Sequence, residues 1–62
     1  MIRKELVTLP RGSCIRIGKV EYTIRGFDLK IGYMELRKPD GDSRWVNIDY
    51  VADRAQLLQG EE

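Results

Sequence analysis

Histidine is absent from this 62-residue chain, and cysteine occurs only once, as Cys14. Without histidine, the chain lacks the commonest general base and the commonest metal ligand. A single cysteine can form neither an internal disulfide nor a zinc site of its own. We therefore expect a protein that is not an enzyme and that uses no metal ion or cofactor, with Cys14 as an inert thiol among the apolar neighbours of a strand.

Long apolar runs are also missing. No stretch approaches the roughly 20 uninterrupted apolar residues of a membrane span, and the first residues lack the apolar core of a secretory signal. We expect a cytoplasmic protein with no membrane partner. The chain is long enough for one small domain, predicted over residues 1–59, which is followed by a frayed acidic tail at 60–62.

The charges are unevenly distributed along the chain. The first 38 residues hold nine basic and four acidic side chains, a balance of +5, whereas residues 39–62 hold two basic and six acidic ones, a balance of −4. A basic body with an acidic end can hold a polyanion on one face and repel it from another. The same distribution also fits the mixed surface that keeps a small protein in solution.

Apolar and polar residues alternate from Ser13 to Asp49, and turn residues interrupt the alternation at short intervals. This period of two predicts strands rather than helices. Gly18 can adopt the positive φ of a two-residue turn, and the Pro39-Asp40-Gly41 run is the clearest turn in the sequence. Gly26 and residues 27–29 interrupt the second strand. The predicted strands are Cys14–Ile17, Val20–Arg25, a third from about Lys30 to Arg37, and Ser43–Ile48.

The two ends of the sequence give different patterns. Val51, Ala55 and Leu58 share a face at helical spacing, which predicts a short helix over residues 49–58 with Asp49 as its N-cap. Residues 5–9 are expected to form another strand, followed by a turn at 10–12. A helix over residues 2–7 is the alternative.

Four or five short antiparallel strands cannot hide their edges in a wide sandwich, and partial closure into a barrel removes those edges. The sequence therefore predicts a mainly β protein, a small SH3-like antiparallel barrel of four or five strands with a short C-terminal helix. A swapped or edge-paired homodimer is the alternative way to complete so small a core.

The Pro39–Gly41 turn allows a prediction about one face of the sheet. If Met34 and Leu36 face the core together with Val46 and Ile48, the residues between them must point to solvent. The same alternation can be continued to the preceding strand. The residues that it predicts to face solvent are Thr23, Arg25, Tyr33, Glu35, Arg37, Trp45 and Asn47.

Exposed rings offer stacking surfaces for unpaired bases, and arginine contacts phosphate and can stack as well. We therefore predict a site for single-stranded RNA or DNA, with two aromatic rings and two arginines on the face and three further basic residues at its rim. The predicted site residues are Arg25, Lys30, Tyr33, Arg37, Lys38, Arg44 and Trp45.

Two other interpretations of the same residues stay open. The rings could pack half-buried over the sheet and the terminal helix, as aromatic side chains often do. Alternatively, the patch or a sheet edge could dock a protein partner, and the protein would then be a small regulator or inhibitor of phage or mobile-element type.

A glycine turn, a tyrosine-containing strand and a Gly-X-X-X-Trp-Val strand follow one another in the sequence. They lie in Leu9–Ser13, Ile17–Gly26, Met34–Arg37, Asp40-Gly41 and Arg44-Trp45-Val46. In this order, and over about two thirds of its length, the sequence resembles the small SH3-like β-barrel modules of transposases and other mobile-element proteins. The resemblance implies an SH3-like fold and an association with DNA transactions, not a catalytic role.

The order Leu-X-X-Leu, Arg11-Gly12, Ile17-Gly18, Ile24-X-Gly26 and a closing helix is similar to the carbon storage regulator family of RNA-binding translational repressors, which are intertwined dimers. The sequence departs from that family's loop between the middle strands, where it has the Pro39–Asp42 turn instead. The run Gly26-Phe27-Asp28 also resembles the Gly-Phe-Asp of the ring-forming Sm-type barrels. Both of these families bind RNA.

Overall fold

The computed structural model describes residues 1–58. In sequence order the elements are α1 (Arg3–Val7), β1 (Cys14–Ile17), β2 (Val20–Asp28), β3 (Tyr33–Arg37), β4 (Ser43–Asn47), α2 (Ile48–Arg54) and β5 (Ala55–Leu57). The predicted acidic tail at 60–62 and the last residue of the predicted domain, at 59, lie outside the described residues. No helix within residues 1–58 has the length and apolar character that a bilayer crossing requires.

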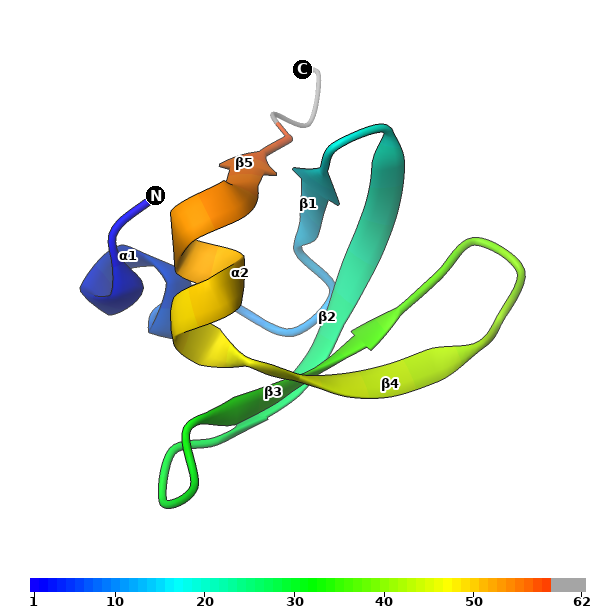
Figure 1. The fold of residues 1–62 in the computed structure, drawn as a ribbon. Coiled ribbons are helices and arrows are strands. Elements are labelled where there is room, and N and C mark those ends of the chain that lie inside the picture. Colours follow the sequence, from blue (N-terminus) through cyan, green and yellow to red (C-terminus); the bar gives the residue numbers. More distant parts are fainter. Residues whose placement is uncertain (59–62) are drawn as a thin grey trace.

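The five strands form one antiparallel sheet in the order β4-β3-β2-β1-β5. β1 to β4 follow one another as hairpins, whereas β5 returns through α2 and pairs with β1 (Figure 1). β4 and β5 are the two edges and do not pair with each other, so the sheet is not closed. The prediction of a mainly β protein with a short helix near its C-terminal end is confirmed at this level.

One face of the sheet carries the core. α1 and α2 lie against the same side of the sheet (Figure 1), and their buried side chains join those of the strands in a single apolar cluster. This cluster consists of Leu6, Ile15, Ile24, Met34, Leu36, Ile48, Val51, Ala52 and Ala55. The opposite face, which we call the outer face, is covered by neither helix.

The turn between β1 and β2 follows the prediction. Ile17 pairs with Val20, which leaves Gly18 and Lys19 as a two-residue connection. Gly18 has a φ of 64°, and no residue other than glycine has a positive φ among the described residues. This is the pattern of a II′ turn, whose twist matches that of the strands it joins.

The β3–β4 turn is also where the sequence predicts it. The amide of Lys38 donates to the carbonyl of Asp42 at 2.7 Å, and the amide of Gly41 donates to the carbonyl of Lys38 at 2.9 Å. The carboxylate of Asp40 accepts a further bond from the amide of Asp42 at 2.9 Å. Gly41 has a φ of 95°, a conformation that strains residues with a Cβ.

The predicted interruption of the second strand is a bulge, not an end. β2 continues to Asp28, and its register with β3 shifts between Ile24 and Gly26. The extra residue is Arg25. Beyond the bulge Phe27 faces Met34, so the apolar side chains return to the core side.

The third strand begins later than predicted. β3 starts at Tyr33 rather than near Lys30, because the backbone first closes a turn in which the amide of Gly32 donates to the carbonyl of Asp28 at 2.9 Å. Leu29 and Ile31 are therefore exposed turn residues.

The C-terminal helix is shorter than predicted and begins one residue earlier. Its N-cap is Asn47, not Asp49, and the Asn47 side chain accepts hydrogen bonds from the amides of Asp49 and Tyr50 at 2.9 and 3.2 Å. The helix ends at Arg54, and the predicted last turn is instead strand β5. β5 pairs with β1 on the side opposite β2, so the backbone N–H and C=O groups of β1 have hydrogen-bond partners on both sides.

The N-terminal segment is a helix, so the strand predicted over residues 5–9 is wrong and its helical alternative is right. α1 begins after Ile2, and the amide of Leu6 donates to the carbonyl of Ile2 at 3.0 Å. The predicted turn that follows is present, with the amide of Ser13 bonded to the carbonyl of Pro10 at 3.1 Å. A strand at 5–9 could not pair with β1, because β5 occupies that edge.

Cys14 is also placed differently from the prediction. It pairs with Thr23, one residue out of phase with the buried Ile15, and its side chain is exposed rather than packed among apolar neighbours. Alternation along β1 explains this result, since only one of two successive residues can face the core.

Candidate functional site

The outer face has the composition that the parity argument predicts. Met34 pairs with Val46, and both lie on the core side. The pairs on the outer face alternate with this one, which places polar and aromatic side chains opposite one another across β3 and β4. These pairs are Tyr33 with Asn47, Glu35 with Trp45, and Arg37 with Ser43.

Both rings on this face are open to solvent. Trp45 is 52% exposed and Tyr33 is 38% exposed, so part of each ring is open to solvent and part is covered by the protein. Trp45 stands directly opposite Glu35, which makes Tyr33 its diagonal neighbour on one side. Diagonal neighbours in an antiparallel pair are about 7–8 Å apart, within reach of aromatic side chains.

Arg37 is the diagonal neighbour of Trp45 on the other side, because it pairs with Ser43. Its side chain forms no ion pair with another of the described residues, and it leans toward the β3–β4 turn, with Nη2 3.6 Å from where a Cβ on Gly41 would lie. By register, Trp45 thus has Tyr33 and Arg37 as its diagonal neighbours, and the guanidinium group of Arg37 lies on the side of the turn.

Acidic side chains share the outer face. Glu35 lies half-buried opposite Trp45, and Asp28 pairs with Tyr33 at the other end of β3. Neither carboxylate forms an ion pair within residues 1–58. The middle pair of the face therefore combines an aromatic ring with a carboxylate, and the face is not a strongly positive surface.

Three of the other predicted site residues lie at the periphery of this face. Arg25 is exposed at the bulge of β2 and borders a shallow hollow with Arg11 and Thr23. Lys30 is exposed in the turn between β2 and β3. Lys38 follows the other end of β3, and its Nζ lies 3.9 Å from an Asp42 carboxylate oxygen. The sequence pattern does not indicate Arg11, because this residue belongs to a turn with no periodicity.

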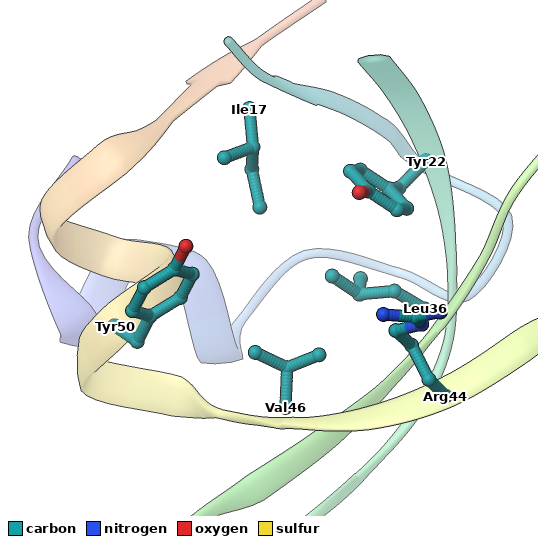
Figure 2. Close-up of a pocket in the computed structure, with 6 residues that line it drawn as sticks. All are labelled: Ile17, Tyr22, Leu36, Arg44, Val46 and Tyr50. Carbon is teal, nitrogen blue, oxygen red and sulfur yellow. The ribbon is translucent and has the colours of Figure 1, made fainter.

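Arg44 lies on the opposite side of the sheet from this face, which corrects its predicted place at the rim. It pairs with Leu36, on the core side of β4. The parity that places Val46 on the core side also applies to Arg44, two residues earlier. The position of Arg44 could therefore have been predicted from the sequence. At this position Arg44 borders a cavity of about 230 Å³ (Figure 2).

The cavity contains two tyrosines that the predicted site does not include. Its lining residues are Ile17, Tyr22, Leu36, Arg44, Val46 and Tyr50. Tyr50 lies on the exposed side of α2, where Arg54, four residues later, places its guanidinium carbon 4.1 Å from the ring centroid. This i,i+4 spacing is visible in the sequence, whereas the cavity depends on how α2 sits over the sheet.

Metal-binding groups are not gathered anywhere in the part of the protein that the structure describes. Residues 1–58 contain no cluster of three or more histidine, cysteine, aspartate or glutamate side chains that could hold an ion. The exposed Cys14 Sγ lies 3.9 Å from the carbonyl oxygen of Gly12.

Comparison of the sequence and fold with family models, with curated proteins and with solved structures found no match. Function is therefore inferred from the surface chemistry.

Proposed function

We propose that the protein is a non-enzymatic module that binds single-stranded nucleic acid across the outer face of its sheet. The observation that supports this function is the exposed Trp45 with Tyr33 and Arg37 as its two diagonal neighbours. An unpaired base can stack on each ring, and the guanidinium group of Arg37 can pair with the phosphate between or beside them.

The dimensions of the face suit a short stretch of nucleic acid. Tyr33 and Arg37 are four residues apart on β3, or about 13 Å at about 3.3 Å per residue. Sheets that bind RNA through exposed aromatics stack two or three bases. Two stacked bases at about 1–3 kcal/mol each give about 2–6 kcal/mol, which corresponds to weak binding, with a Kd between tens of millimolar and tens of micromolar.

The charges favour a single strand over a duplex. Duplex binding depends mainly on many lysine and arginine contacts to phosphates. Along β3, by contrast, the outer face presents Arg37 together with the carboxylate of Glu35, and the carboxylate of Asp28 lies opposite Tyr33. Stacking needs the faces of unpaired bases, which a duplex does not present. Arg25, Lys30 and Lys38 lie at the periphery, where they can contact phosphates outside the stacked pair.

We also infer an SH3-like architecture for the sheet. The supporting observations are the strand order β4-β3-β2-β1-β5, the hairpin connections from β1 to β4 and the short helix before β5. A barrel of this kind fits the resemblance to mobile-element modules and an association with DNA transactions.

A protein-binding regulator is the second candidate function, and the open sheet edges favour it. β4 and β5 each have a neighbour on one side only, so an extended partner segment, or a second copy of the protein, could add a strand to either edge. A pull-down from nuclease-treated cytoplasm distinguishes the candidates, because a protein partner survives that treatment and a nucleic-acid bridge does not.

The direct test uses the only tryptophan in the sequence, Trp45, as its own reporter. Stacking of a base on the indole should quench its fluorescence when unlabelled oligothymidylate or oligouridylate is titrated at low salt. A hairpin duplex of the same composition should quench it much less. Absence of quenching by every single strand would refute the proposed function.

Variants assign the binding to the outer face. With a labelled oligonucleotide and anisotropy as the readout, Trp45→Ala should weaken binding about 5- to 150-fold, which corresponds to the stacking energy of one base. The matched control is Ile2→Ala, which removes another exposed apolar side chain, 69% exposed, next to α1. Equal affinities for the wild type and Trp45→Ala would show that nucleic acid binds elsewhere.

A further inference from the structure

The cavity on the core side of β4 has apolar walls that come from four strands. Ile17 of β1, Leu36 of β3 and Val46 of β4 present aliphatic side chains to it, and Tyr22 of β2 adds a ring. Figure 2 shows these side chains around a common space, with Tyr50 of α2 on the far side from Tyr22. A ligand group in this space would exchange water for contact with hydrocarbon.

The polar groups at the cavity are all donors that lack a side-chain partner. Within residues 1–58, neither the Arg44 guanidinium nor the hydroxyl of Tyr22 or Tyr50 forms a hydrogen bond with another residue, and Arg44 forms no ion pair. Arg44 is the one charged residue among the described residues that line the cavity. An anion placed beside Arg44 would meet a cation and no carboxylate from the lining, and the tyrosine hydroxyls offer further polar groups at two other points of the wall.

The volume limits the ligand to a small group. At about 230 Å³, the cavity falls below the roughly 300–1,000 Å³ of sites for drug-sized ligands, yet it exceeds the roughly 30 Å³ share of a single water several-fold. One ring or one branched aliphatic group fits, and a whole nucleotide does not. A nucleobase would also leave its polar edge against Ile17, Leu36 and Val46, whose side chains offer no hydrogen-bond partner.

We propose that this cavity is a binding site for a small apolar group that carries a carboxylate, with the apolar group between Tyr22, Leu36 and Val46 and the carboxylate on Arg44. A planar carboxylate matches the paired N–H groups of a guanidinium, and each bond of this kind is assisted by charge. The chemistry is that of a free aryl or alkyl acid, and also that of a peptide C-terminus whose last residue is apolar.

The test is a titration of the ¹⁵N-labelled protein followed by two-dimensional NMR, with 3-phenylpropionate as the probe. Saturable shifts are expected at Ile17, Tyr22, Tyr50 and β4. The uncharged isostere 3-phenylpropionamide should shift the same resonances several-fold less at equal concentration. Equal binding of acid and amide would overturn the role of the carboxylate, and absence of saturable shifts up to millimolar probe would overturn the site.

Two variants and one control assign the site. Arg44→Gln should weaken binding of the acid about 3- to 10-fold and leave the amide unchanged, because it removes the charge and keeps a polar side chain there. Val46→Phe fills the cavity and should abolish the shifts from both probes in protein that stays folded by circular dichroism. Arg16→Gln removes an exposed arginine of β1 that bonds to Gln56, and it should bind like the wild type. An effect of Arg16→Gln equal to that of Arg44→Gln would reduce the finding to general charge attraction and overturn the site.

Further measurements distinguish the sources of the ligand. A short peptide that ends in phenylalanine with a free carboxylate, compared with its C-terminal amide, shows whether a peptide end can enter. Binding of the peptide acid assigns the site to protein termini, whereas binding of 3-phenylpropionate alone assigns it to free acids. Shifts of the same residues with protein concentration alone, without any probe, would show that a second copy fills the cavity and would overturn the proposal.

Discussion

Leu6 links the shortest helix of the described structure to the core. Its side chain is 0% exposed and belongs to the single apolar cluster, although α1 spans only five residues. A helix this short is not stable alone in water, so packing of Leu6 against the cluster must hold α1 in place. We therefore expect Leu6→Ala to be among the most destabilising substitutions in the protein.

The magnitude follows from burial and from the length of the protein. Truncation of a fully buried leucine to alanine costs about 2–5 kcal/mol, which combines lost transfer free energy with the cavity that remains. At about 0.05–0.15 kcal/mol per residue, a 62-residue domain has a stability of only about 3–9 kcal/mol. Its unfolding entropy, about 2.1 cal/mol/K per residue, converts each kcal/mol into a Tm shift of about 8 °C. Leu6→Ala should thus lower Tm by about 15 °C or more.

Urea and thermal unfolding, followed by far-UV circular dichroism, provide the measurement. Ile2→Ala is the control, because it truncates a neighbouring apolar side chain that is 69% exposed, and it should change stability by less than about 0.5 kcal/mol. Leu6→Met keeps the volume and should cost less than about 1.5 kcal/mol, which leaves a folded variant if Leu6→Ala unfolds. Similar losses for Leu6→Ala and Ile2→Ala would refute the docking of α1 on the core.

Two further predictions concern the cap of α2 and the charges of the outer face. Asn47→Ala should cost about 1 kcal/mol, or about 8 °C in Tm, because Asn47 accepts from two amides at the start of α2. Asp49→Ala removes an exposed ion pair with Arg3 and a negative charge in the first turn of α2, and it should cost less. The reverse order in thermal melts would contradict the cap. Arg37→Gln should make the dependence of log K on log salt for single-stranded oligonucleotides less steep by about 0.7, the value for one phosphate contact. Glu35→Gln should raise affinity at low salt, because it removes a negative charge from the face. An unchanged slope for Arg37→Gln would exclude Arg37 as a phosphate contact.

Much of the sheet could be predicted from the sequence because its signals are local. A period of two between Ser43 and Asn47, together with a turn that joins it to β3, fixes which residues face the core. The exposed Trp45 follows from that rule alone. The same rule places Arg44 on the core side. Its charge suggests a position at the rim of the outer face, but alternation along β4 decides the direction of the side chain.

The two ends of the sequence are harder to predict, since their patterns are too short to separate two periods. Leu6, Val7 and Leu9 fit a strand or one helical turn equally well. Ala55 lies at helical spacing from Val51, yet it is buried as the first residue of β5. Its conformation is decided by pairing with Ile17, 38 positions earlier in the sequence, and no local pattern contains that partner.

β4 gives side chains to both proposed sites, because it is a five-residue edge strand whose residues alternate between the faces. Trp45 points to the outer face, while Arg44 and Val46 point to the cavity. Stacking acts only at contact distance, so loss of the Trp45 ring removes nothing that an acid in the cavity touches. The charge of Arg44 acts over about 10 Å at 0.1 M salt and can reach nucleic acid on the other face. Trp45→Ala should therefore weaken nucleic-acid binding and leave binding of the acid unchanged. Arg44→Gln should affect the acid alone only at salt concentrations that screen the charge of Arg44.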